Sequence, residues 1–504
     1  MDEKQTSDED QPDELSQKMS QWQRTHPHAT LTDIEEAVEA ELAQLRKRIV
    51  EEMVREKETA SQEEPDCPQC SERMVKNGRR SRKLRGKEGQ TIELDRQQWR
   101  CLSCGATLFP LDRALGLLHG AYTPQVQEAI TRLGSRMSYG EAREELARLW
   151  KVKISTGSVR RLTLRHGCVA ETLQQEKVAQ LEATAPRPTA QPEQMVMCID
   201  GAMVQVTSGE WREVKTMVLG EFEPHWDAKQ RQVVTRTSQL SYFSRVDTAE
   251  SFSRSALVEW QRRGGDNAHT VVAVQDGANW IQGVIDYHCP QATRVIDFAH
   301  AQGYVAVAGR AIYGAETDAF RQWYGRMSRQ LGHQSPQRTV NELRLLHRQH
   351  PDHPQAEEIT TAIRYLEKRL PMIDYPHFRR QQIPIGSGIV ESGHKVVMQK
   401  RMKQAGMRWA EASLNPMLTL RVALCNQTWN QSWREIEARV RQAKYPSRIE
   451  PKYPLPRASE PDIVTEADCR RMTQLAERIA QRKRRPWQNH RWVFPHRTNL
   501  LHQK

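Results

Sequence analysis

The sequence contains no long hydrophobic run. Because it has no stretch of about 18 apolar residues, we expect no membrane-spanning helix and no membrane partner. The first residues also lack the basic and apolar regions of a secretory signal. Cysteine is scarce: four of the nine cysteines stand in two tight pairs and the rest are scattered, which fits a reducing cytosol better than a disulfide framework. We therefore expect a cytoplasmic protein.

Acidic residues are outnumbered by basic ones. The 504 residues include 75 Lys and Arg against 63 Asp and Glu, which gives a net charge of +12. This balance predicts an acidic partner, above all nucleic acid; the alternative is a basic protein without a particular ligand. The length allows about two to four domains.

Three acidic residues stand next to apolar runs or glycines. Asp200 and Asp276 each end a short apolar run and precede a glycine, and Glu391 follows a loop with two glycines. Acids at the ends of separate elements in a basic protein predict a site for two Mg²⁺ (or Mn²⁺) ions that acts on phosphodiesters, because hard divalent ions prefer oxygen ligands. For each acid taken alone, the alternative is an ordinary surface or capping residue.

Two Cys-x-x-Cys pairs give the strongest local signal. Each pair predicts a tight turn that aims two thiolates at one point, and two such turns complete a tetrahedral site for one structural zinc ion. Residues 65–112 are therefore expected to form a zinc ribbon, with disulfides or free thiols as the alternative. The basic residues between the pairs are expected to follow a phosphate backbone rather than only to form a solvated surface. The zinc ligands are Cys67, Cys70, Cys101 and Cys104, and the basic residues are Arg79, Arg80, Arg82, Lys83 and Arg85.

The segment ahead of these cysteines, residues 1–64, combines an acidic start with a helical pattern. The start is expected to be disordered as far as residue 29, and an amphipathic helix follows, opened by a capping box of Thr32 and Glu35. This helix either lies on the core or forms a short coiled coil for self-association.

The sequence pattern of residues 113–170 predicts three short helices. The second of them begins with a capping box of Ser138 and Glu141. Their order is that of a helix-turn-helix DNA-binding domain whose last helix enters the major groove, with a generic three-helix bundle as the alternative. Residues 171–194, which contain several prolines, are expected to be a linker. The last helix presents Ser158, Arg160, Arg161 and Arg165.

The next part of the chain combines strands and helices. In residues 195–300, three strand-like runs precede alternating helix and strand, which is the order of a ribonuclease H-like α/β domain. The first and fourth strands are neighbours in that fold, so Asp200 and Asp276 are expected side by side. Residues 301–383 have a helical pattern and are expected to be an all-α insertion, after which the domain resumes at residues 384–440.

Two basic segments follow the third acid. The helix that begins there carries Lys395, Arg401 and Lys403, which are expected to bind DNA. Residues 441–504 form a basic tail in which arginines alternate with aromatic residues, a mixture typical of single-strand stacking or of a disordered tail.

Five motifs follow one another along the chain. They are Asp200-Gly, Asp276-Gly-Ala-Asn-Trp-Ile281, Asp297-Phe-Ala-His300, Gly386-Ser-Gly-Ile-Val-Glu391 and Arg401-Met-Lys-Gln-Ala-Gly-Met-Arg-Trp409. In this order they resemble the transposases of ISKra-type bacterial insertion sequences, within the wider DDE group that includes the mutator-like enzymes. The resemblance covers residues 65–435 and includes the zinc ribbon ahead of the helix-turn-helix.

The resemblance implies that Asp200, Asp276 and Glu391 hold the catalytic metal ions and that Asp297 and His300 support the site. It further implies a nucleoid-associated bacterial enzyme that binds double-stranded DNA, both transposon ends and target, as a homo-oligomer, and that cleaves and then joins DNA strands. Two other functions stay open: a non-catalytic DNA-binding regulator, and a ribonuclease H-like nuclease without strand transfer.

One position departs from the family pattern. Ser392 stands where family members often have glycine after the glutamate. The carboxylate itself is kept, so the departure concerns how closely DNA approaches it.

Overall fold

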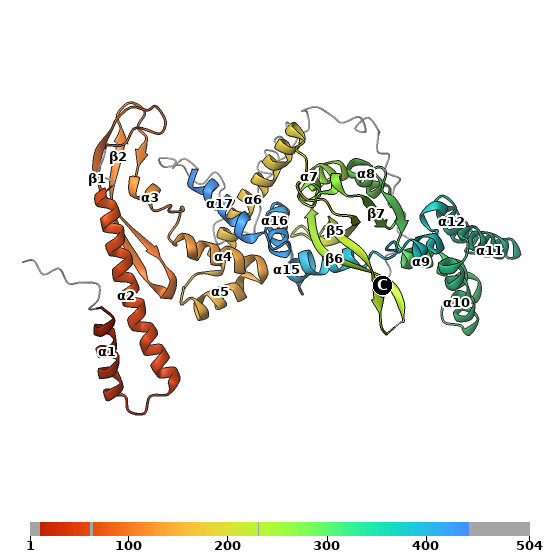
Figure 1. Ribbon diagram of the computed structural model, residues 1–504, viewed down its shortest axis with the longest axis horizontal. Coiled ribbons are helices and arrows are strands. Elements are labelled where there is room, and N and C mark those ends of the chain that lie inside the picture. Colours follow the sequence, from red (N-terminus) through yellow and green to blue (C-terminus); the bar gives the residue numbers. More distant parts are fainter. Residues whose placement is uncertain (1–10, 61–63, 230, 443–504) are drawn as a thin grey trace, which may run out of the picture. The chain divides into compact units, whose positions relative to one another are not determined.

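The computed structural model describes residues 11–60, 64–229 and 231–442 (Figure 1). The chain divides into two compact units, which are described separately: the first contains the residues up to Thr163 together with those from Trp433, and the second contains Leu164–Ser432. The beginning of the acidic start and nearly all of the basic tail lie outside the described residues. Within the described part of the chain, no helix combines the length and the apolar character needed to cross a membrane.

The first unit begins with two helices, α1 (Gln11–Thr25) and α2 (Leu31–Ala60). The expectation of disorder up to residue 29 is therefore wrong for α1. Its partly buried side chains recur at spacings of four and three, so that a narrow apolar stripe packs on α2 in spite of the polar composition. These side chains are Leu15, Met19 and Trp22.

The cap of α2 differs from the predicted one. Thr30 and Asp33 form it: the Asp33 carboxylate accepts from the Thr30 amide at 2.8 Å, and the Thr30 hydroxyl accepts from the Asp33 amide at 3.3 Å. Thr32 and Glu35 have the same spacing but lie inside the helix. Because the sequence contains both pairs, spacing alone does not decide which one forms the cap.

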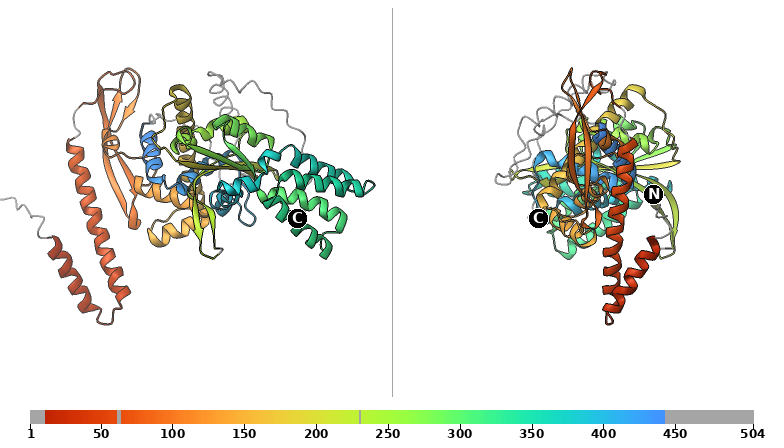
Figure 2. Two further views of the ribbon diagram at one scale, coloured as in Figure 1. Left: turned by 45° about the vertical axis from the view of Figure 1, so that its right-hand side comes forward. Right: turned by 90° about the vertical axis from the view of Figure 1, so that its left-hand side faces the viewer.

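A three-stranded antiparallel sheet follows, in the order β1 (Met74–Arg85), β2 (Thr91–Cys101) and β3 (Thr107–Leu108). Figure 2 shows α2 running beside the β1–β2 hairpin, where Val50 and Val54 pack near the buried Leu84 and Leu94. A short helix, α3 (Pro110–Ala114), closes this part of the unit.

Three helices complete the first unit: α4 (Pro124–Arg136), α5 (Tyr139–Leu149) and the start of α6 (Thr156–Thr184). The predicted capping box at Ser138 and Glu141 is confirmed. The buried side chains they share include Val126, Ile130, Ala142, Leu146, Val152 and Val159.

Helix α6 continues well beyond residue 170, so the expected linker is shorter than predicted. The helix runs on because apolar residues such as Val178 and Leu181 keep its helical spacing, and it stops just before Pro186, the first proline of the segment.

The second unit is built on a five-stranded sheet in the order β6-β5-β4-β7-β8. The first three strands in the chain are antiparallel, and the last two join parallel to the first. The first and fourth strands are therefore neighbours, as the sequence predicts. The strands are β4 (Gln194–Gln205), β5 (Trp211–Asp227), β6 (Gln232–Arg245), β7 (Thr270–Gln275) and β8 (Thr293–Ile296).

One face of this sheet is covered by α7 (Ala249–Arg262) and α8 (Asn279–His288). Met195, Met197 and Ile199 of β4 point to this side and pack into one apolar core with both helices. Because side chains alternate along a strand, the even-numbered residues of β4 face the opposite side.

Residues 301–383 are helical, as predicted. α9 packs against α10 and α12, and α11 packs against α12 and α10 (Figure 1). The helices are α9 (Phe298–Tyr313), α10 (Asp318–His333), α11 (Pro336–Gln349), α12 (Ala356–Glu367) and α13 (Tyr375–Arg380). Short 3₁₀ turns lie at Lys87–Gly89, Gly265–Asn267, Leu370–Met372 and Glu411–Ser413.

The chain then returns to the sheet through α14 (Gly388–Gly393), a π-helical segment (His394–Gln399) and α15 (Lys400–Met402). The motif that ends at Trp409 forms a loop beside the end of β4, where the Trp409 amide donates to the Gln205 carbonyl at 3.1 Å. Its indole donates to the Met402 carbonyl at 3.0 Å. The last helices are α16 (Leu414–Cys425) and α17 (Trp429–Gln442).

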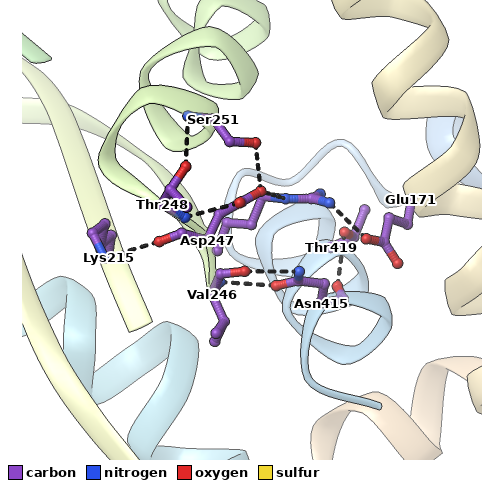
Figure 3. Close-up of polar contacts among 9 residues, drawn as sticks. Glu171, Lys215, Val246, Asp247, Thr248, Ser251, Asn415 and Thr419 are labelled. Atoms are coloured by element: carbon purple, nitrogen blue, oxygen red, sulfur yellow. Dashed lines mark hydrogen bonds and ion pairs between the residues drawn. The ribbon is translucent and has the colours of Figure 1, made fainter. Parts of the chain in front are cut away.

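A buried polar network joins α6, β6 and α16 inside the second unit (Figure 3). The Arg245 guanidinium donates to the buried carboxylate of Glu171 at 2.7 Å and to Asp247 at 3.1 Å. Asn415 exchanges two hydrogen bonds with the backbone of Val246. These contacts hold the end of β6 against two helices that are distant in the sequence.

Candidate functional site

Asp200 lies in the central strand of the second unit. It follows Ile199, which faces the core, so strand alternation turns the Asp200 side chain to the opposite face of the sheet. The side chain is 40% exposed, and one carboxylate oxygen accepts from the Gly201 amide at 2.7 Å. The carboxylate is therefore open to a ligand from solvent.

Asp276 follows the neighbouring strand. β4 and β7 are parallel, and their register pairs Cys198 with Val274, so the same offset carried further brings Asp200 opposite Asp276. Burial raises the pKa of Asp276, and the charge of Asp200 raises it further, whereas the Ala278 amide and His300 lower it. Two carboxylates that interact in this way favour the binding of a cation between them.

Asp297 ties the loop before Glu391 to this edge of the sheet. One oxygen of its carboxylate accepts from the His300 amide at 2.8 Å and caps α9. The other accepts from the amide and the hydroxyl of Ser387, at 2.7 and 2.9 Å. Ser387 precedes α14, which carries the exposed Glu391 and packs on β4 and β5.

Main-chain hydrogen bonds join the same segments. The Asp297 amide donates to the Gln275 carbonyl at 2.8 Å, directly before Asp276. The Phe298 amide donates to the Ile385 carbonyl at 2.9 Å, directly before the glycine-bracketed loop. The segments that carry Asp276 and Glu391 are thus connected through one short segment, the Asp297-x-x-His300 motif, and β4 with Asp200 joins them through its pairing with β7.

The helical insertion contacts the backbone of the Asp276 loop, which the sequence did not indicate. The Tyr365 hydroxyl donates to the Asp276 carbonyl, and the Arg369 guanidinium donates to the Gly277 carbonyl at 2.9 Å. Gly277 has a φ of 84°, and a side chain there would collide with both residues. Tyr365 also stacks on Tyr304, with 3.8 Å between ring centroids.

His394 is a further residue near the acids that the sequence analysis did not single out. It is buried, and its Nε2 lies 3.5 Å from Oδ2 of Asp200. A signal for it exists in the sequence, because a histidine three residues after Glu391 on a helix stands on the same side as the acid. For Tyr365 in α12 and Arg369 just after it no such signal exists, since both are distant from the acids in the sequence.

The spacing of the acids bears on what they can bind. Among the described residues, only the four paired cysteines form a group of three or more ligands whose atoms all lie within 4.8 Å of one another. Ligands of one hard ion at about 2.1 Å lie at most about 4.2 Å apart, whereas those of two ions about 3.5–4 Å apart can be further separated. A single ion shared by all three acids therefore does not fit this geometry.

Cys67, Cys70, Cys101 and Cys104 lie close enough to bind one zinc ion. Three of the Sγ–Sγ distances between the two pairs are 3.4–3.6 Å, near the edge of about 3.8 Å expected for a zinc–thiolate tetrahedron. Each pair forms a tight turn that ends in a residue with positive φ, Ser71 or Gly105. The amide of Cys104 lowers the pKa of the Cys101 thiol to about 6, which favours the thiolate that zinc requires.

The basic residues of the hairpin differ in their surroundings. Arg82 belongs to the fold, because its guanidinium donates to the buried Asp112 at 2.9 Å and to two main-chain carbonyls. Arg79 is exposed but pairs with two carboxylates. The other predicted DNA contacts on this hairpin, Arg80, Lys83 and Arg85, are exposed.

At the start of α6, the predicted DNA-binding residues are only partly available. The hydroxyl of Ser158 takes part in the helix cap, since it interacts with Ser155 at 3.0 Å and accepts from the Arg161 guanidinium at 2.8 Å. Arg161 and Arg165 are exposed, and Arg160 is partly exposed.

Of the basic residues after Glu391, Lys395 and Lys403 are exposed but Arg401 is not. Arg401 is 1% exposed, and its guanidinium carbon lies 5.0 Å from the centroid of the Trp409 ring. Arg401 was expected to bind DNA, but its side chain is buried. It packs instead on Trp409 in the loop that returns to β4.

No protein-family model matches this sequence, and a search of the curated proteins finds no significant match. The function is therefore inferred from the residues of the chain itself.

Proposed function

We propose that this chain is a DDE transposase, which binds the ends of an insertion sequence and catalyses metal-dependent DNA cleavage and strand transfer. One observation carries the proposal: β4, which contains Asp200, pairs in parallel with β7, which Asp276 directly follows, and Asp297 accepts hydrogen bonds from the loop before Glu391. The strand order β6-β5-β4-β7-β8 supports it, because it is the order expected of a ribonuclease H-like domain.

The three acids have a common task in this proposal. When bound, two Mg²⁺ or Mn²⁺ ions activate the attacking oxygen and stabilise the leaving oxygen of the phosphodiester. Asp200, Asp276 and Glu391 hold the ions, and Asp297 keeps the loop of Glu391 in place. Cleavage by water and joining by the freed 3′-hydroxyl use the same site, so no side chain has to form a covalent intermediate with DNA.

The four-cysteine hairpin and the three-helix segment that ends with the start of α6 supply DNA binding. The four-cysteine hairpin, proposed as a zinc ribbon, exposes Arg80, Lys83 and Arg85, and the three-helix segment, proposed as a helix-turn-helix, exposes Arg161 and Arg165. Exposed guanidinium and ammonium groups replace counterions along a phosphate backbone, so binding should weaken steeply with salt. The partners are double-stranded transposon ends and target DNA, bound by a homo-oligomer.

The test uses the DNA that flanks the gene, which supplies candidate ends. Full-length protein is incubated with Mg²⁺ or Mn²⁺ and two substrates: an intact end, which reports cleavage, and a pre-cut end with a free 3′-hydroxyl, which reports joining to a plasmid. A transposase cleaves the first and joins the second, and both products disappear when the divalent ion is omitted.

The competing functions give different products in the same assay. A nuclease of the same fold cleaves the intact end but leaves the pre-cut end unjoined. A DNA-binding regulator retards both substrates in a gel and converts neither. Either result would overturn the proposal.

A further inference from the structure

His394 is a buried histidine beside the candidate metal site. It begins the π-helical segment that directly follows α14, and only 4% of the residue is exposed. Short π-helical segments occur frequently at functional sites. His394 lies three residues after Glu391, so both side chains stand on one side of the helix, and a Glu-x-x-His pair of this spacing holds the metals of helical di-metal carboxylate proteins.

Neither ring nitrogen of His394 has a hydrogen-bond partner among the residues that the structure describes. Oδ2 of Asp200 lies 3.5 Å from Nε2, and this separation is too long for a good hydrogen bond. Buried polar groups in proteins are normally paired, and an exception calls for an explanation such as an ion or a catalytic role.

The separation of these two atoms fits a shared ion better than a direct contact. Two ligands at about 2.1 Å from one ion lie about 3.0–3.4 Å apart at octahedral or tetrahedral angles. The observed 3.5 Å is close to that range. His394 directly follows α14, whereas Asp200 lies in β4. The two residues meet because α14 packs on β4 and β5. This close packing depends on Gly393, where a side chain would collide with Val218 and Tyr242.

We propose that His394 is a metal ligand, which binds one of the two divalent ions together with Asp200. This inference rests on the proposed function, because it concerns the same metal site. A nitrogen ligand changes the preference of the site: oxygen donors suit Mg²⁺, whereas imidazole raises the affinity for transition metals such as Mn²⁺. The wild-type site therefore binds Mn²⁺ more tightly than Mg²⁺.

The competing explanation is a direct interaction between a protonated His394 and Asp200 without metal. This direct interaction accounts for only one of the two ring nitrogens. It also predicts that replacing His394 leaves metal binding unchanged or improves it, because the carboxylate of Asp200 becomes available to the metal. Metal binding to the protein without DNA therefore separates the two explanations.

The test measures Mn²⁺ bound to the full chain, with its cysteine site loaded with zinc, by electron paramagnetic resonance. Pulsed spectra of the wild-type protein are expected to show coupling of Mn²⁺ to an imidazole nitrogen. In His394→Asn this coupling disappears and the dissociation constant for Mn²⁺ rises at least about tenfold. In His394→Asp, an oxygen ligand is restored, the nitrogen coupling stays absent, and the preference for Mn²⁺ over Mg²⁺ falls.

A matched control is His300→Asn, because His300 also lies near Asp276 and is not proposed as a ligand. It must keep the nitrogen coupling. If the coupling survives in His394→Asn, or if the wild-type protein binds Mn²⁺ without nitrogen coupling, the inference is wrong, whether or not the protein cleaves DNA. If the coupling is present but no DNA is cleaved or joined, His394 is a ligand and the proposed function fails instead.

Discussion

The hydroxyl of Tyr365 donates a hydrogen bond to the main-chain carbonyl of Asp276. Tyr365 lies in α12, far along the chain from the strand that Asp276 follows, so the helical insertion fixes the backbone that carries a candidate metal ligand. Arg369 makes the equivalent contact with Gly277. The helical segment 301–383 thus contributes contacts to the candidate site through Tyr365 and Arg369.

Removing this hydroxyl should impair the metal site without unfolding the protein. In Tyr365→Phe the ring keeps its stacking on Tyr304, but the Asp276 loop loses a hydrogen bond worth about 1 kcal/mol, so we expect cleavage at limiting metal to fall roughly fivefold. The measurement is the initial cleavage rate as a function of Mn²⁺ concentration. Tyr304→Phe is the control, because in the described part of the chain the Tyr304 hydroxyl makes no hydrogen bond to the Asp276 loop, and an equal effect in both variants would contradict this role.

Zinc should be bound by the four cysteines in a ratio of one ion per chain. Cys101→Ser removes a buried ligand, so we expect the bound zinc to be lost and DNA affinity to fall at least about tenfold as the hairpin loosens. Elemental analysis and a gel-shift titration measure the two effects. Cys425→Ser is the control, since this thiol donates to a main-chain carbonyl that a hydroxyl can also reach, and it should retain the zinc.

Glu171 should make the stability of the second unit depend on pH. Burial raises the pKa of its carboxyl group, and Arg245 only partly opposes this effect. A raised pKa in the folded state means that the carboxyl group favours folding most at low pH, and that this contribution is lost as the pH rises through the folded pKa.

Two variants at Glu171 separate charge from contact. Glu171→Gln removes the ionisation but keeps an oxygen for Arg245, so thermal unfolding should show a smaller decline in stability with rising pH than in the wild type. Glu171→Ala withdraws the oxygen from a buried guanidinium and should destabilise the unit by about 3 kcal/mol at pH 7. If Gln destabilises as much as Ala, the ionised pair rather than the hydrogen bond is what the fold needs.

Arg401 and Lys403 should differ in what their removal affects. Arg401 is buried on Trp409, so Arg401→Ala should lower the unfolding temperature by several degrees, as loss of a packed cation and its stem does. Lys403 is exposed, so Lys403→Ala should keep the unfolding temperature. It should lower the slope of the logarithm of DNA affinity against the logarithm of salt concentration by about one, which corresponds to one fewer released counterion. The assignment is wrong if Lys403→Ala lowers the unfolding temperature, or if Arg401→Ala changes only the salt dependence of DNA binding.

Local patterns predicted those parts of the fold that local forces determine. The cap at Ser138, the cysteine turns and the adjacent strands β4 and β7 all agree with the sequence patterns. Asp200, however, lies inside β4 rather than at the end of an element, because the second apolar run continues the strand past Gly201. Asp297 was singled out only through the family resemblance, and in the structure it caps α9 directly after β8.

Features that depend on distant partners could not be predicted. The sequence predicted Arg82 and Arg401 to be exposed DNA contacts. In the structure Arg82 forms an ion pair with the buried Asp112, and Arg401 packs on the ring of Trp409. The helix α1 was missed because its narrow stripe needs α2 to pack on. The contacts of Tyr365 with the Asp276 loop arise only once the insertion has folded back onto the sheet.

The most direct test of the central claim replaces Asp276 by its neutral isostere. Asp276→Asn should abolish cleavage of intact ends and joining of pre-cut ends, with rates reduced at least about a thousandfold, while DNA binding and the unfolding temperature stay close to those of the wild type. Asp200→Asn and Glu391→Gln should give the same result. Cleavage by Asp276→Asn at a rate near that of the wild type would contradict the proposal that these three acids hold the catalytic metal ions.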